Sequence, residues 1–207
     1  MTDPFSPAGV SGNWHMNAVL SRHMDDGDLG MGFITAGEAL VQHWKEHGAN
    51  DGLFVPIVLN FRHGLELLLK CAIRDAARSL RASGDSDSSL VPTKLDNWLL
   101  RKAGHSLQSL AIRLDEYLGR LDLEQLPADT HSVLLSIHNL DPRGDTFRYV
   151  TTWDKGTRSY QPTPRPKAEH VDVGEMAKQF SEVGTLIGFG VLTVLEQHRE
   201  MLAEWGP

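Results

Sequence analysis

The chain has very little cysteine and an excess of acidic over basic side chains. Cys71 is its single cysteine, so no disulfide can form within the chain, which suits a reducing compartment. The net charge is −7, with 27 acidic and 20 basic side chains. This charge opposes broad binding to duplex nucleic acid, which needs a cationic face. It does not exclude a small local site for a nucleotide or an RNA end.

Membrane, secretion and nucleotide-binding signals are also missing. No stretch approaches the roughly 18 apolar residues that a membrane-spanning helix needs. Residues 1–7 lack the basic start of a signal peptide. Neither Gly-x-Gly-x-x-Gly nor Gly-x-x-x-x-Gly-Lys-Ser/Thr occurs, so there is no nucleotide fingerprint. We therefore expect a cytoplasmic protein that does not associate with a membrane.

Helical periodicity dominates what is present. The length of 207 residues and an apolar fraction of 41% predict one domain with a core of its own. Residues 1–12, rich in Pro, Ser and Gly, are expected to be loose, and residues 13–207 to form a single helical domain. Apolar spacing and turn residues predict helices at about 14–23, 31–47, 53–82, 95–100, 106–121, 127–140 and 172–205.

Residues between these helices predict turns and one β-hairpin. Asp25-Asp26-Gly27-Asp28 and Asn50-Asp51-Gly52 are typical of turns. Residues 147–160 favour extended chain on both sides of Gly156, and residues 161–166 contain three prolines and predict a linker. The predicted fold is therefore all-α, an up-and-down helical bundle with a small β-hairpin insertion before the last long helix.

The predicted helix 53–82 is strongly apolar and still carries charges. Arg62, Glu66 and Lys70 are spaced four residues apart and share one stripe of the helix, and His63 lies beside them. Charges on a buried helix are costly unless they pair with each other or with a ligand. They form either an internal ion-pair ladder that fixes helix packing, or a pocket in which Arg62 and Lys70 hold an anion and Glu66 orients them.

A second polar group lies at the expected helix ends and on the hairpin. His105 precedes a helix, Asp141 closes one, and Arg148 and Tyr149 fall in the extended segment, where neighbouring side chains face opposite ways. Arg148 could reach Asp141 or Glu66, which would pin the hairpin to the bundle. Alternatively, Arg148 and a histidine form an acid–base pair for RNA cleavage, which needs a base and a cation.

Four motifs in order resemble a known family. They are Gly37-Glu38-Ala39-Leu40, then Arg62-His63 with Glu66-Leu67 and Lys70, then Gly104-His105-Ser106-Leu107, and last the run from Asp141 to Tyr149. Over about residues 30–200 the chain resembles bacterial HEPN-like helical proteins. This resemblance implies a helical domain from toxin–antitoxin, phage-defence or RNA-processing systems. The family's ribonuclease motif, an Arg and a following His separated by four to six residues, is matched by Arg165 and His170.

Two functions follow from these patterns. The first is an HEPN-like domain associated with RNA or a nucleotide and, if it is an enzyme, a metal-independent ribonuclease that uses Arg165 and His170, or Arg148 and His105. The second is a non-catalytic dimeric interaction module or small-ligand sensor with a structural polar cluster. Both are expected without a cofactor, and a protein partner from the same operon is a further expectation.

Two further patterns bear on partners and metals. Gly184 and Gly188 share one face of the last helix and permit close helix approach, inside the bundle or across the homodimer that the resemblance implies. His43 and His47 match the His-x-x-Glu-His pattern of inverted zinc proteases. We interpret these two as solvated surface histidines and expect no bound metal.

Overall fold

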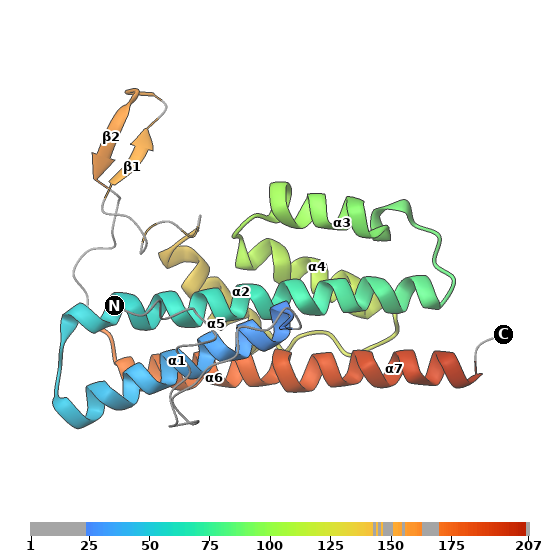
Figure 1. Cartoon of the computed structure of the whole chain (residues 1–207), viewed down its shortest axis with the longest axis horizontal. Coiled ribbons are helices and arrows are strands. Elements are labelled where there is room, and N and C mark those ends of the chain that lie inside the picture. Colours follow the sequence, from blue (N-terminus) through green and yellow to red (C-terminus); the bar gives the residue numbers. More distant parts are fainter. Residues whose placement is uncertain are drawn as a thin grey trace, which may run out of the picture.

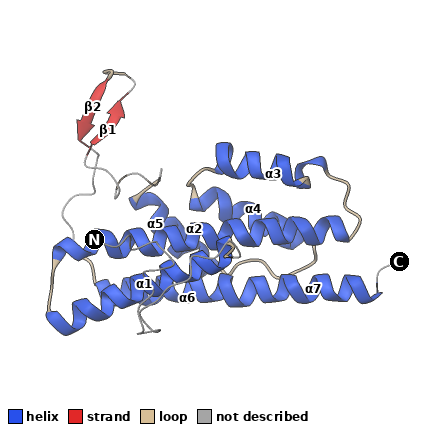
Figure 2. Cartoon of the chain, in the orientation of Figure 1, coloured by secondary structure: helices blue, strands red, loops and turns tan. Residues whose placement is uncertain are grey.

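The structure is a computed structural model that describes residues 24–142, 144, 146, 151–154, 156–162 and 170–205. The predicted loose segment 1–12 and the predicted helix 14–23 lie outside these residues. The described chain is helical except for one hairpin, as predicted (Figure 2). Its elements are α1 (Asp26–His47), α2 (Asp51–Ala82), η3 (Ser88–Leu90), α3 (Pro92–Trp98), η4 (Leu99–Ala103), α4 (Leu107–Arg120), α5 (Ala128–Leu140), β1 (Thr151–Asp154), β2 (Ser159–Pro162), α6 (Val173–Thr185), η5 (Leu186–Val191) and α7 (Leu192–Trp205).

Helix α1 begins earlier than the sequence predicted. Asp25 is its N-cap: the Asp28 N–H donates to Asp25 Oδ1 at 2.9 Å, and the Asp25 N–H donates to Asp28 Oδ2 at 3.3 Å. This reciprocal capping box satisfies two backbone donors that would otherwise have no partner. The prediction of a turn at 25–28 was therefore wrong, because aspartates that favour turns also favour helix starts.

Glycines explain how closely α1 approaches α2. A Cβ atom at Gly30 would lie 2.8 Å from Leu68 Cγ, and one at Gly64 would lie 2.8 Å from the Gly30 carbonyl oxygen. Real side chains essentially never come so close, so only glycine fits this crossing. Gly30 weakens the helical pattern in the sequence but allows α1 to approach α2 closely.

Helix α2 is the centre of the molecule. Asn50 caps it, accepting the Gly52 N–H at 3.1 Å, so residues 51–52 belong to the helix and not to the predicted turn. Helices α1, α4, α6 and α7 all pack against it (Figure 1). By length and composition alone, α2 is long and apolar enough to cross a membrane. This differs from the prediction that no stretch of the sequence is apolar enough to do so. In the structure, half of its most apolar window is buried among the other helices.

The last helix is continuous from Val173 to Trp205, through a π-helical segment, η5. This confirms the predicted helix 172–205. A Cβ at Gly184 would lie 3.1 Å from Ile34, and one at Gly188 would lie 2.6 Å from the Met31 sulfur. These glycines were predicted to allow close helix packing either inside the bundle or across a homodimer. The structure shows the packing inside the bundle.

The shorter helices depart from prediction in detail. The helical turn expected at 95–100 is longer, because Pro92 starts α3 and η4 continues it as a π-helix to Ala103. Ser106 caps α4 by accepting the Ser109 N–H at 3.2 Å. Both α4 and α5 agree with the predicted ranges to within two residues.

The predicted hairpin is confirmed for its described part. Strands β1 and β2 are antiparallel, with Trp153 opposite Tyr160. Residues 161 and 162 belong to β2, so the prediction of a linker was wrong for these two residues. The reason is that Pro162 closes an edge strand, where its missing N–H does no harm. Figure 1 shows the hairpin standing apart from the helices.

Candidate functional site

Arg62 organises the polar cluster inside the bundle. Its side chain is 1% exposed. Nη2 donates to the carbonyl oxygens of His105 at 2.7 Å and Asp141 at 2.9 Å. Nη1 lies 3.2 Å from Glu66 Oε2, and Nε lies 3.1 Å from Asp141 Oδ2. Every guanidinium nitrogen is therefore paired, and Arg62 joins α2 to the loop before α4 and to the end of α5.

Asp141 fixes the chain that leaves α5. Its carboxylate is fully buried, and Oδ1 accepts the Thr146 N–H at 3.0 Å. Gly144 between them has φ +77°, and a Cβ there would lie 3.0 Å from His105 Cβ. The Asp-Pro-x-Gly segment is thus tied into the cluster, and glycine is required at 144 for both its backbone angle and its space.

Glu66 is the buried carboxylate at the centre. Its Oε1 accepts a hydrogen bond from Lys70 Nζ at 2.7 Å and lies 2.9 Å from His105 Nδ1. Burial raises the pKa of Glu66, but Lys70 and then His105 outweigh it, so the pKa lies below its ordinary value. Glu66 is therefore an anion at neutral pH.

His105 is the member of the cluster that reaches solvent. Its ring is 45% exposed, whereas the Glu66 carboxylate that it contacts is buried. An anionic Glu66 favours the tautomer with the proton on Nδ1, which leaves a lone pair on Nε2. The described residues give Nε2 no hydrogen-bond partner. A histidine held in this way can accept and return a proton at Nε2.

Two other histidines near the cluster have different surroundings. His63 packs edge-on against Phe33 of α1, with ring centroids 4.5 Å apart. His138, on α5, has a pKa below its ordinary value because burial and the charge of Arg62 oppose its protonation, although Asp141 partly compensates. The structure thus brings together Arg62, Glu66, Lys70, His105 and Asp141 of the predicted site.

Of the four remaining predicted residues, the structure describes only His170. His170 is exposed just before α6. Arg148, Tyr149 and Arg165 lie outside the described residues, so their contacts with Asp141, Glu66 or His170 remain predictions.

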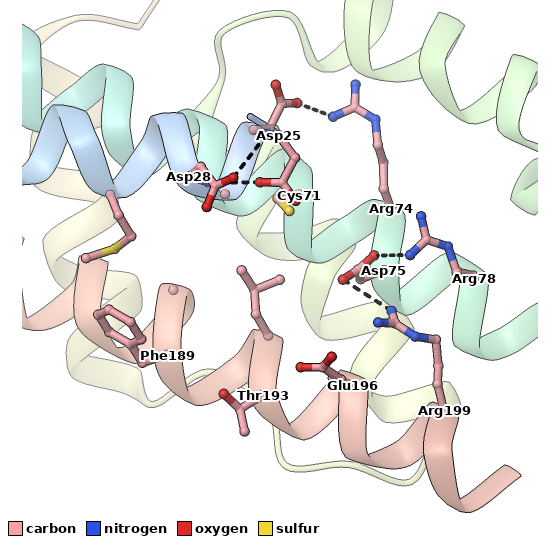
Figure 3. Close-up of a pocket in the computed structure, with 15 residues that line it drawn as sticks. Asp25, Asp28, Cys71, Arg74, Asp75, Arg78, Phe189, Thr193, Glu196 and Arg199 are labelled. Atoms are coloured by element: carbon pink, nitrogen blue, oxygen red, sulfur yellow. Dashed lines mark hydrogen bonds and ion pairs between the residues drawn. The ribbon is translucent and has the colours of Figure 1, made fainter. Parts of the chain in front are cut away.

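The sequence reading missed an open cleft of about 790 Å³ between the start of α1, the middle of α2 and the η5–α7 segment (Figure 3). Arg74 bonds to Asp96 at 2.9 Å and also pairs with Asp26. Asp75 pairs with Arg78 at 2.9 Å and with Arg199 at 3.2 Å. The arginines that line the cleft are therefore neutralised by carboxylates. The only sequence signal for this cleft is the acidic run at 25–28, which predicts a turn.

Cys71 lies in the wall of this cleft (Figure 3). Burial, with the charges of Asp25 and Asp75 next, raises the pKa of the thiol to about 11. The thiol is therefore protonated at neutral pH and is a poor nucleophile. This agrees with a packing role for the cysteine.

No group of three or more His, Cys, Asp or Glu side chains in the described part of the chain is arranged to hold a metal ion. His43 and His47 stack on each other at the end of α1, with ring centroids 4.1 Å apart, and His47 Nδ1 lies 3.0 Å from the His43 carbonyl oxygen.

Comparisons with known proteins find no family model, no curated protein and no solved structure that matches this chain.

Proposed function

We propose that this chain is an HEPN-like domain that associates with RNA and cleaves it without a metal ion, in a toxin or phage-defence setting. The observation that carries the proposal is His105, a half-exposed ring held through Nδ1 by a buried carboxylate. The ordered motifs that resemble HEPN-like proteins support the choice of RNA as substrate.

In the proposed reaction His105 acts as the base. Nε2 takes the proton of a ribose 2′-hydroxyl, and the 2′-oxygen attacks the adjacent phosphorus. The bond from phosphorus to the 5′-oxygen breaks, and that oxygen takes a proton from solvent as it leaves. The products are a 2′,3′-cyclic phosphate and a 5′-hydroxyl, and the imidazolium returns its proton to solvent. No electron or further reactant is consumed.

Neighbouring residues prepare this step. Lys70 is partly exposed and donates to the same Glu66 oxygen that His105 contacts, so its ammonium group is next to the ring and can stabilise charge on the phosphorane. Glu66 and Arg62 are positioning residues: the first holds the ring of His105, and the second holds its backbone carbonyl. Arg62 itself is too buried to hold an anion directly.

The test is RNA cleavage in the presence of a chelator by the wild-type protein and matched variants. His105→Gln should lower the rate about 100-fold or more, the usual effect of losing a general base. His43→Gln, at an exposed histidine of α1, is the control and should leave the rate unchanged. Arg165→Ala and His170→Ala examine the family motif. Loss of activity only in those two variants would contradict the role of His105.

A non-catalytic dimeric interaction module is the second candidate. The observation that favours it is that every guanidinium nitrogen of Arg62 already has a partner within the protein. These buried contacts are enough to explain the cluster as a network that stabilises the fold. Under this alternative the wild-type protein cleaves no RNA, and sedimentation shows a dimer whose assembly does not depend on His105.

A further inference from the structure

The hairpin has one aromatic face that the helical bundle does not cover. Trp153 and Tyr160 are cross-strand neighbours with ring centroids 5.2 Å apart at 72°. The two residues are 54% and 70% exposed. Thr151 and Pro162 pair on the same face. Figure 1 shows that the hairpin projects away from the helices, so these rings do not form part of the core.

Polar side chains also stabilise the hairpin. Asp154 Oδ1 accepts the Thr157 N–H at 2.7 Å at the turn. On the opposite face from the rings, the Gln161 side-chain amide donates to Ser159 Oγ at 2.8 Å. A two-stranded hairpin alone is marginally stable in water, and the contact between the two rings supports it. The exposed surface of both rings is open to a ligand.

The charge of this region differs from that of the rest of the chain. Residues 142–168 contain six basic and two acidic side chains, a net charge of +4 in a chain whose total is −7. Among them, Arg158 is exposed at the hairpin turn. In the sequence, therefore, positive charge is concentrated on both sides of the hairpin, and Arg158 presents a cation on the hairpin itself that would attract a polyanion.

We propose that the Trp153–Tyr160 face of the hairpin stacks unpaired bases of single-stranded RNA. Aromatic rings beside basic side chains are the common platform for such strands, because every base has a face that can stack. The choice of RNA rests on the proposed function. Thr146 is anchored to Asp141 in the polar cluster, and β1 begins five residues later. The Cα atoms of Thr146 and Thr151 are therefore within about 18 Å of each other. At this distance one RNA strand can reach both the polar cluster and the hairpin.

The experiment measures binding of a fluorescent 2′-O-methyl RNA of about 12 nucleotides to the full chain. The methyl group blocks the 2′-oxygen, so binding is measured without cleavage. Trp153→Leu and Tyr160→Leu keep apolar bulk but remove the ring, and each should raise Kd roughly 5- to 100-fold. Trp153→Phe should retain most of the affinity. A duplex of the same sequence should bind more weakly than the single strand.

Two controls isolate the aromatic face. Gln161→Ala changes the opposite face of the hairpin, and Phe189→Leu removes an exposed ring from the helical body. Both should bind like the wild type. Unchanged Kd in Trp153→Leu and Tyr160→Leu would overturn the proposal. So would a wild-type dimer that Trp153→Leu converts to a monomer with unchanged RNA binding, because a second copy would then cover the face.

The outcome separates this inference from the proposed function. Ring-dependent binding with no cleavage of ordinary RNA by the wild type would retain the hairpin proposal and reject the ribonuclease. Cleavage with ring-independent binding would do the reverse.

Discussion

At the scale of single residues, the buried charges are the most informative feature. The spacing of Arg62, Glu66 and Lys70 was sufficient to predict a polar stripe on a buried helix. It could not predict that Arg62 would bond to the carbonyl oxygens of His105 and Asp141, which are 43 and 79 residues away. Those contacts depend on where two distant loops pass, and side-chain spacing on one helix does not contain that information.

Arg62→Ala should destabilise the protein by about 3–5 kcal/mol, because it leaves the buried Asp141 carboxylate without its cation and removes one of the two cations that pair with buried Glu66. Arg78→Ala is the matched control. It breaks an exposed i,i+3 pair with Asp75 and should change the free energy of unfolding by less than about 1 kcal/mol. Urea denaturation of both variants provides the measurement. If Arg62→Ala lowered the free energy of unfolding no more than the control does, the cluster would not be what stabilises the fold.

His138 should make stability depend on pH. Its pKa is lowered from 6.5 in the folded chain, so the unfolded chain binds more protons in the interval just below 6.5. Its contribution to stability is complete above pH 6.5 and is lost as the pH falls toward the lower folded pKa. In His138→Gln, the free energy of unfolding should fall less as the pH drops below 6.5, because the contribution of this imidazole is gone. In His43→Gln it should fall as much as in the wild type. Identical pH curves for wild type and His138→Gln would contradict the burial of this imidazole.

At the scale of elements, apolar periodicity predicted most of the described helices, and residues that favour extended chain predicted the hairpin. It failed at the start of α1, where Asp25 is a cap and Gly30 is a contact residue. Aspartate is common both in turns and at helix N-caps, and glycine is common both in turns and where helices cross closely. Only the position of α2 decides between these alternatives. The cleft was missed for the same reason, since α1, α2 and α7 form it jointly.

Gly64→Ala should destabilise the protein by about 1–3 kcal/mol although alanine favours helices, because its Cβ would collide with the backbone of α1. Gly32→Ala is the control on α1: a Cβ there meets nothing within 4 Å, so alanine should stabilise the helix by up to about 1 kcal/mol. Thermal unfolding compares the two. Stabilisation by both substitutions would contradict the close crossing of α1 and α2.

At the scale of the whole molecule, the acidic helical body and the basic hairpin region divide the charge of the chain. The sequence revealed this division only when charges were counted by segment, because the total of −7 hides it. The exposure of the aromatic face could not be predicted. The alternation of side chains along β1 and β2 shows which residues share a face of the hairpin, but not whether another element packs over that face.

Arg158→Ala should weaken RNA binding and reduce the slope of log Kd against log salt by about 1, as the loss of one phosphate contact does. The control is Arg78→Ala on α2, which should leave the slope unchanged. Titrations at several salt concentrations give both slopes. An unchanged slope in Arg158→Ala would place the phosphate contacts elsewhere.

The most direct test of the account is the chemistry of the RNA ends after incubation with purified protein in a chelator. We predict 2′,3′-cyclic phosphate and 5′-hydroxyl ends from the wild type, with His105→Gln folded but inactive. Intact RNA from a folded wild-type protein, or the same cleavage by His105→Gln, would contradict the claim that the Glu66–His105 pair performs the reaction.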